Sequence, residues 1–298
     1  MDTLFDNVFS PSSFSELFTI WNRFPLAIPY AGGTNMNLNQ SLKEKFPLLP
    51  ENQENNIPKK PPVFLSLDKI EELHRITRTE QYLDIGAMVN LNSLLRLGKI
   101  VPHVIRGCLE NIAGVQVRNI ATVGGNVCSV KKGDDPNSKR LFDLPVPLTA
   151  LDAQYELRTA QTSRWVSAAR FHSITEKTGI NSQELLTRIR LPLYQWDYSV
   201  YKKFCGEGFF SGETLVFLAK TQKNILSEIR ILYKGGSIIR NKDSESILNG
   251  KYLPLNRKTA DEFVESWKEF LTHKREETDF LKNALLYTIG ENVKNLSE

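Results

Sequence analysis

Two Gly-Gly turns constrain the fold of this chain more than any other feature. The first reads Ala31-Gly32-Gly33-Thr34-Asn35 and follows a short strand-like run, and the second reads Ala121-Thr122-Val123-Gly124-Gly125-Asn126 beside β-branched residues. Glycine allows positive φ and lets the backbone approach a ligand closely. Successive N–H groups in such turns form an anion-binding nest. Two nests together suit a pyrophosphate, although a Gly-Gly between strands is also a common hairpin turn.

Motif spacing and composition exclude several classes of protein. Neither turn has the spacing GxGxxG, or GxxxxGK followed by Ser or Thr, which excludes the Rossmann and P-loop nucleotide sites. The chain has 298 residues, and its 38 Lys and Arg against 34 Asp and Glu give a net charge of only +4. These charges are scattered, so a nucleic-acid partner is not expected. No apolar run reaches the roughly 18 residues of a membrane span, so a membrane partner is not expected either.

The N-terminus and the cysteines indicate a cytoplasmic protein. Residues 1–6 have no basic region ahead of an apolar stretch, so no secretory signal is expected. The three cysteines, Cys108, Cys128 and Cys205, lie too far apart for a CxxC motif. Their small, odd number is typical of a reducing compartment. The histidines match no metal-ligand spacing, so no metal site is predicted.

The apolar pattern predicts mixed helices and strands up to about residue 192. Strands are predicted over 27–31, 63–67 and 82–87, with a short helix over 68–76, while the proline-rich residues 38–62 are predicted to be an exposed excursion. The first helix is predicted from the spacing of Phe14, Leu17, Phe18 and Trp21, with Ser13 and Glu16 as a capping box.

The pattern changes after Pro192, which predicts a second domain. Residues 213–220 and 225–233 are strand-like and predict a small antiparallel sheet. Helices follow, the first starting at a capping box of Thr259 and Glu262. The apolar stripes of these helices are Phe263, Trp267, Phe270 and Leu271, then Phe280, Leu281, Leu285 and Ile289.

Several motifs in order resemble the FAD-binding, or medium, subunit of the molybdenum hydroxylases, the xanthine dehydrogenase and carbon monoxide dehydrogenase group. The family's flavin loop AGGTD corresponds to residues 31–35, and its stretch around RNxaTiGGN corresponds to residues 112–126. Further family patterns match residues 85–94, 143–153, 184–192 and 201–204. The resemblance runs from about residue 8 to the end of the chain.

The resemblance implies an α+β fold. Residues 1–192 would form a PCMH-type FAD-binding module of two subdomains, about 1–62 and 63–192. Residues 193–298 would form a small C-terminal domain like that of the carbon monoxide dehydrogenase flavoprotein, with antiparallel strands and terminal helices.

The resemblance also implies a cofactor site for FAD. The cofactor-binding residues carried over are Ala31, Gly32, Gly33, Thr34, Asn35, Thr122, Gly124, Gly125, Asn126, Asp143, Leu186 and Lys203. The two loops would hold the FAD phosphates and Asp143 the ribose and ribityl hydroxyls. Leu186 would pack on the adenine, and Lys203 would lie towards the isoalloxazine. No residue is assigned a catalytic or metal-binding role, because the flavin supplies the chemistry.

Each assignment has a structural alternative. Leu186 alone reads as a core residue, Lys203 as a solvated surface lysine, and Cys128 as an inert buried thiol. Arg118 and Asn119, which match the family's RN pair, are interpreted as a brace that hydrogen-bonds the turn backbone.

The chain departs from the family pattern in three places. Asn35 replaces the Asp of AGGTD, and the 38–62 excursion is longer than the family's link. After the second loop the family's Ser-Pro pair is missing, and a charged excursion stands in its place. Asp134 or Asp135 in this excursion is an alternative to Asp143 as the matching acid.

The implied function is an electron-transfer subunit of a molybdopterin-dependent hydroxylase or dehydrogenase, an FAD-dependent oxidoreductase. Its partners would be an iron–sulfur subunit and a molybdopterin subunit. Electrons would pass from [2Fe–2S] clusters to FAD and on to NAD or another acceptor. Two other interpretations remain: a stand-alone flavin oxidoreductase, and a flavin-free assembly or scaffold subunit.

Overall fold

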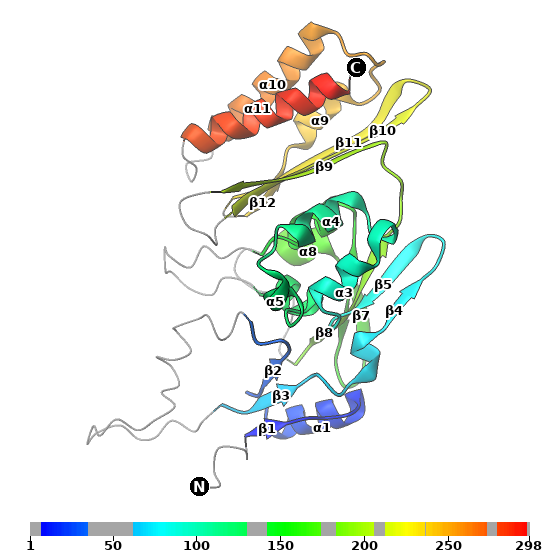
Figure 1. Ribbon diagram of the computed structural model, residues 1–298, viewed down its shortest axis with the longest axis vertical. Helices are drawn as coiled ribbons and strands as arrows, with labels where there is room; N and C mark the ends of the chain where they lie inside the picture. Colours follow the sequence, from blue (N-terminus) through cyan, green and yellow to red (C-terminus); the bar gives the residue numbers. More distant parts are fainter. Residues whose placement is uncertain are drawn as a thin grey trace, which may run out of the picture.

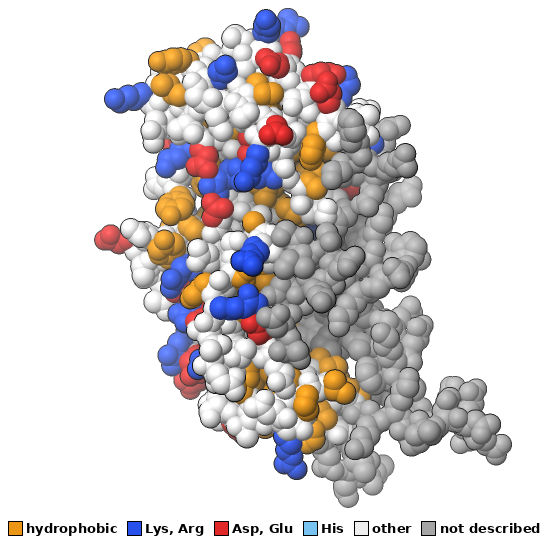
Figure 2. Space-filling model, turned by 180° about the vertical axis from the view of Figure 1, so that it is seen from behind, with side chains coloured by type: hydrophobic (Ala, Val, Ile, Leu, Met, Phe, Trp, Pro, Cys, Tyr) orange, Lys and Arg blue, Asp and Glu red, His pale blue; other side chains and the backbone are white. Residues whose placement is uncertain are grey.

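Three sheets follow one another along the long axis of the molecule (Figure 1). The computed structural model describes residues 7–34, 62–129, 142–173, 183–205, 212–235, 237–272 and 279–296. Of the 38–62 excursion, only Pro62 is therefore described. Asn35, Asp134 and Asp135 also lie outside the described residues. Positive and negative side chains are interspersed over the face shown in Figure 2.

The first sheet is parallel and carries one helix. Its strands are β1 (Val8–Phe9), β3 (Phe64–Ser66) and β2 (Ile28–Tyr30), in that order, beside α1 (Phe14–Arg23). These elements confirm the predicted helix and the strands expected over 27–31 and 63–67. Because β3 completes this sheet, residues 64–66 lie with the N-terminal strands, beyond the subdomain boundary expected at 62–63.

The start of α1 differs in one contact from the predicted capping box. The Ser13 hydroxyl accepts the Glu16 N–H at 3.3 Å, as expected for an N-cap. The Glu16 carboxylate instead accepts the N–H and hydroxyl of Ser12, at 2.8 and 3.0 Å, because its side chain reaches one residue further back. The four apolar residues of the predicted stripe are buried.

The second sheet is antiparallel and has five strands. Its order is β4 (Ile76–Arg78), β5 (Tyr82–Gly86), β8 (Leu185–Pro192), β6 (Gln154–Arg158) and β7 (Ser163–Ser167). The strand predicted over 82–87 is confirmed. The helix predicted over 68–76 is wrong: only the 3-10 turn η2 (Glu71–His74) forms there. Residues from Ile76 onward pair with β5 instead, so sheet hydrogen bonds take over from the helical ones.

Short helices pack beside the five-stranded sheet (Figure 1). They are α3 (Leu91–Arg96), η3 (Gly98–Ile100), α4 (His103–Glu110), α5 (Val115–Arg118), α6 (Val123–Cys128), α7 (Pro145–Ala150) and α8 (Ala168–Ser173). Together with the first sheet they share one continuous hydrophobic core.

The third sheet has two buried faces. Its strands are β12 (Ile238–Arg240), β11 (Ile225–Lys234), β10 (Gly212–Gln222) and β9 (Tyr198–Cys205), all antiparallel. Phe217 of β10 packs under the terminal helices, whereas its neighbours Val216 and Leu218 belong to the main core. The terminal helices are α9 (Lys242–Leu248), α10 (Arg257–Thr272) and α11 (Asp279–Asn295). This alternation buries one sheet against both parts of the chain.

The strands predicted over 213–220 and 225–233 are confirmed, but the predicted start of α10 is wrong. The helix begins at Arg257, two residues before Thr259. The Asn256 side chain accepts the Thr259 N–H at 2.8 Å, so Asn256 provides the cap. Asparagine is as good an N-cap as threonine, and the apolar stripe alone does not fix the first turn. Within the described ranges, no helix combines the length and apolar character needed to cross a membrane.

Candidate functional site

The two glycine loops touch through their backbones. A Cβ built on Gly32 would lie 2.0 Å from the Ile120 carbonyl oxygen, so no larger residue fits there. Ile120 lies two residues before Thr122, which begins the second loop. Gly33 has φ +66, a left-handed conformation that glycine adopts without strain. The fold therefore brings the two predicted cofactor loops side by side.

The first loop offers unused hydrogen-bond donors. None of the N–H groups of residues 31–34 donates to another described residue, and all four residues are half-buried. Backbone N–H groups without partners are uncommon away from solvent. A run of them in a glycine turn suits an anion such as phosphate. Residues 31–34 therefore fit the phosphate-binding role predicted for them, while Asn35 lies outside the described residues.

The second loop is the first turn of α6, neither a hairpin nor an open nest. The Thr122 hydroxyl caps it by accepting the Gly125 N–H at 3.0 Å. The N–H groups of Val123 and Gly124 donate to the carbonyls of Val89 and Ala87, at 2.9 and 2.8 Å. These N–H groups are already bonded inside the protein, so they are not donors for a ligand. The sequence did not predict this helix, because glycine is a poor helix former and the segment contains a Gly-Gly pair.

Asn126 connects the second loop to Asp143. Its side-chain oxygen accepts the Leu144 N–H at 3.3 Å, and both Asn126 and Asp143 are buried. Its amide nitrogen has no partner among the residues that the structure describes. That nitrogen is the donor through which α6 can contact a bound molecule.

Two lysines bind the Asp143 carboxylate. Lys203 of β9 donates to Oδ2 at 2.8 Å, and Lys234 of β11 donates to Oδ1 at 2.6 Å. Asp143 and Lys203, both predicted site residues, are thus bonded to each other, and Lys203 is only 20% exposed. The sequence reasoning missed Lys234. The available signal was a lysine ending the apolar strand that runs from Ile229 to Tyr233.

Burial shifts the pKa values of several groups in and beside this cluster. Burial lowers the pKa of Lys234, and the Asp143 carboxylate opposes that shift. Burial raises the pKa of the Cys108 thiol and of the Tyr201 hydroxyl, so both stay uncharged near neutral pH. Two ammonium groups therefore share one carboxylate at the junction with the C-terminal sheet.

The remaining residues singled out from the sequence take no part in the contacts of Asn126 and Asp143. Leu186 is 3% exposed in β8 and belongs to the main core, so its contact with adenine stays a prediction. Arg118 donates to the carbonyls of Ile112 and Ala113 at 2.9 and 2.7 Å, which confirms that it braces the turn. Burial raises the pKa of Cys128 to about 12, as expected for an inert thiol.

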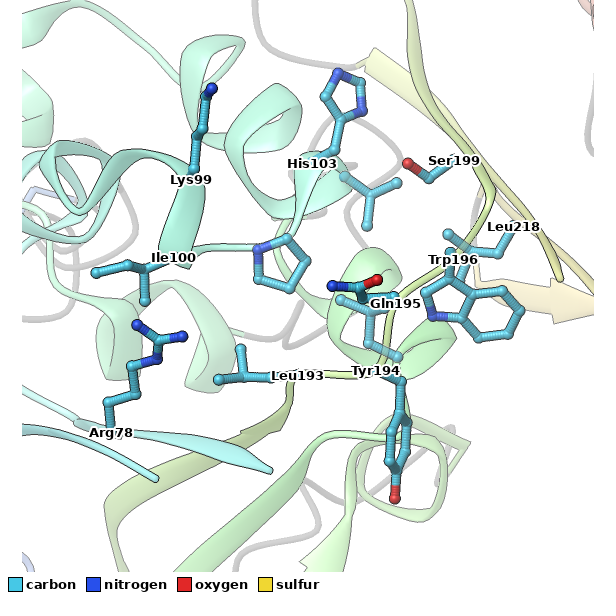
Figure 3. Close-up of a pocket in the computed structure, with 13 residues that line it drawn as sticks. Arg78, Lys99, Ile100, His103, Leu193, Tyr194, Gln195, Trp196, Ser199 and Leu218 are labelled. Atoms are coloured by element: carbon cyan, nitrogen blue, oxygen red, sulfur yellow. The ribbon is translucent and has the colours of Figure 1, made fainter. Parts of the chain in front are cut away.

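A separate cavity of about 310 Å³ lies where the C-terminal sheet meets α4 (Figure 3). It is lined by Arg78, Lys99 and His103 together with Gln195, Trp196 and other residues. None of the predicted cofactor residues lines it. The Lys99 amine and the Tyr194 ring point away from its centre (Figure 3), so these groups do not converge on one ligand.

The described geometry defines a class of site: a glycine loop whose N–H groups donate to no described residue, a capped helix against it, and a buried cluster of two lysines on one aspartate. Comparison with known proteins agrees with this class. Residues 4–194 match the family described as the FAD binding domain in molybdopterin dehydrogenase. This chain belongs to that family, whose cofactor is FAD, and its relatives are oxidoreductase subunits.

Two curated relatives and one solved structure illustrate the similarity. The chain is 29% identical over 178 residues to the glyceraldehyde dehydrogenase medium chain of Sulfolobus acidocaldarius, covering 59% of this chain and 60% of that one. It is 24% identical over 210 residues to the xanthine dehydrogenase FAD-binding subunit of Escherichia coli O157:H7, covering 68% and 69%. The fold matches carbon monoxide dehydrogenase from Hydrogenophaga pseudoflava with a TM-score of 0.74 at 20% identity, over 98% of this chain and 96% of that one. The match thus spans less than two thirds of the Sulfolobus medium chain.

Proposed function

We propose that this chain is the FAD-binding electron-transfer subunit of a molybdopterin-dependent hydroxylase or dehydrogenase. The observation that carries the proposal is the run of N–H groups in residues 31–34 that donate to no described residue, with Gly32 packed against the Ile120 carbonyl. Family membership supports FAD as the molecule that these groups bind. Residues 1–192 would form the two-subdomain FAD-binding module, and residues 193–298 the C-terminal domain.

The contacts with FAD would divide between the two loops. Residues 31–35 would hold the phosphates through backbone N–H groups, with Thr34 adding a hydroxyl. Thr122, Gly124 and Gly125 would form the wall facing them, and the Asn126 amide would donate to the cofactor. Asp143 and Lys203 would lie at the far end of the site, and Leu186 would contact the adenine.

Bound FAD supplies redox chemistry, and the protein holds and tunes it. We infer that electrons arrive from [2Fe–2S] clusters on an iron–sulfur subunit, after a molybdopterin subunit has oxidised the substrate. They would leave to NAD or another acceptor. Names such as "medium chain" among the relatives support a multi-subunit complex. The free thiols of Cys108 and Cys128 support a reducing, cytoplasmic location.

The contact between the loops gives a direct test. Gly32→Ala would place a Cβ 2.0 Å from the Ile120 carbonyl oxygen and force the loops apart. We expect at least about a tenfold loss of FAD affinity, since the N–H groups lose their common orientation. Gly290→Ala is the matched control, because its Cβ would lie 3.8 Å from Val264, an ordinary contact. Equal FAD content in the two folded variants would overturn the assignment of the loops.

The same preparations separate the rival functions. A folded wild-type chain that takes up no FAD would favour the scaffold function. A chain that binds FAD and reduces it with a small substrate, without any other subunit, would favour the stand-alone oxidoreductase.

A further inference from the structure

The cavity of about 310 Å³ beside α4 is enclosed by three separate parts of the chain. Arg78 comes from β4 of the second sheet, His103 from the start of α4, and Leu218 from β10 of the C-terminal sheet. Small-molecule pockets have volumes of roughly 300–1,000 Å³ and often form at such junctions. The cavity is therefore large enough for a small ligand of its own.

The charged side chains around this cavity all have one sign. Arg78, Lys99 and His103 line it, and none of the lining residues that the structure describes is acidic. None of the three forms an ion pair or a side-chain hydrogen bond with another described residue. Arg190 of the same sheet as Arg78, by contrast, pairs with Asp84 at 2.8 Å. A single exposed cation is ordinary, but a cleft lined by charges of one sign attracts the opposite charge.

Neutral hydrogen-bond donors lie beside these basic groups. The N–H groups of His103 and Val104, in the first turn of α4, donate to no described residue. The residue before this helix is a proline and supplies no side-chain cap. Helix N-termini favour anions, because their N–H groups lack partners within the helix. The Gln195 amide, a further donor, lies between Arg78 and Trp196 in Figure 3.

The remainder of the lining is largely apolar. Trp196 and Leu218 lie on the opposite side of the cavity from Arg78 and Ile100 (Figure 3). Burial of apolar surface against such a wall stabilises a bound molecule. The lining thus has one side suited to an anionic group and one side suited to an apolar body.

We propose that this cavity binds a small organic anion, a molecule that carries a carboxylate or phosphate group on an apolar body. The anionic group would lie toward Arg78, and the apolar body would lie against Trp196 and Leu218. None of the predicted cofactor residues lines the cavity, so this ligand and FAD would bind at the same time. The inference does not depend on the proposed function.

Calorimetric titrations of the full chain with phenyl phosphate, benzoate, benzyl alcohol and inorganic phosphate test the ligand class. The tighter of phenyl phosphate and benzoate should bind at least about tenfold more tightly than the neutral benzyl alcohol, because hydrogen bonds to charged groups are the stronger ones. That ranking also identifies the anionic group. Inorganic phosphate should bind more weakly than phenyl phosphate, since it leaves the apolar wall uncovered.

Two variants of the lining test the location. Arg78→Gln should weaken binding of the anionic probes at least about tenfold, and Arg78 is exposed, so the fold should survive. Gln195→Glu adds a negative charge at nearly constant shape. It should weaken the same probes by a similar factor and leave benzyl alcohol unchanged. Lys258→Gln, exposed on α10, is the control for removal of a remote charge and should bind as wild type does.

Anionic probes that bind no more tightly than benzyl alcohol overturn the proposal, as does the absence of binding by all four probes. Wild-type affinity in either folded variant, Arg78→Gln or Gln195→Glu, also overturns it. Displacement of phenyl phosphate by FAD would place the anion in the cofactor site and refute a separate site. A chain that binds phenyl phosphate in this way but takes up no FAD would refute only the proposed function, so the two failures are distinguishable.

Discussion

Removing the Asp143 carboxylate should take from the buried Lys234 the counter-charge to which it donates. Lys234 is 1% exposed and donates to Asp143 at 2.6 Å. Breaking a buried ion pair from one side costs about 3–5 kcal/mol, because the remaining charge keeps its desolvation penalty. Loss of the ion pair with Lys203 destabilises the fold less, since Lys203 has some access to solvent. We expect Asp143→Ala to lower the free energy of unfolding near neutral pH by about 3–5 kcal/mol.

This loss should shrink as the pH rises. Burial lowers the pKa of Lys234 and the Asp143 carboxylate opposes that shift, so the folded variant releases this proton at a lower pH than folded wild type or the unfolded chain, whose lysines titrate near ~10.4. Between the two pKa values the unfolded chain binds more protons, so the free energy of unfolding increases with pH. Burial raises the pKa of the neighbouring Cys108 and Tyr201, which therefore stay neutral over this interval.

Urea unfolding of the FAD-free chain at about pH 7 and about pH 9.5 measures both effects. Glu265→Ala is the control, because Glu265 and its partner Lys268 are 57% and 58% exposed. Such surface pairs contribute about 0–1 kcal/mol, and the Glu265 variant should show no recovery at high pH. The reasoning fails if Asp143→Ala loses no more stability than this control, or if its loss is the same at both pH values.

Two further predictions concern the core. Thr122→Ala should lower the free energy of unfolding by about 1 kcal/mol, because it removes the α6 cap. Thr122→Ser should restore this stability. Thermal unfolding that does not distinguish the two variants contradicts the capping role. Burial lowers the pKa of His172, which contacts the Tyr155 hydroxyl, to about 4. The folded state resists its protonation, so wild-type stability should fall by up to roughly 3 kcal/mol as the pH drops from about 6.5 to about 4. His172→Gln should lose this component in urea unfolding, and an unchanged pH profile would refute it.

Periodic segments were predictable from the sequence alone. The stripe of Phe14, Leu17, Phe18 and Trp21 predicts α1, and alternating apolar residues predict β10 and β11, because burial of one face dominates the energy of these elements. Element starts were less predictable. The cap of α10 moved to Asn256, and residues 68–76 formed a turn and a strand, because pairing with β5 is a long-range contact.

The sequence predicted residues that the fold brings together, but it did not predict the contacts between them. Spacing and resemblance selected Gly32, Asp143 and Lys203. In the fold, Gly32 packs against the second loop, Asn126 of that loop bonds the residue after Asp143, and Asp143 bonds Lys203. They did not reveal that Asp143 is shared between two lysines, since Lys234 lies 91 residues away in sequence. Nor did they reveal that the Gly124 N–H is already bonded to Ala87. Both facts depend on tertiary packing, which a local motif does not encode.

The central claim is that residues 31–34 hold FAD through N–H groups that donate to no other described residue. The most direct measurement is an absorbance spectrum of the purified full-length chain, followed by identification of the flavin released on denaturation. We predict flavin absorbance and close to one FAD for each chain, either as isolated or after incubation with FAD. A folded, colourless chain that fails to take up added FAD would contradict the account.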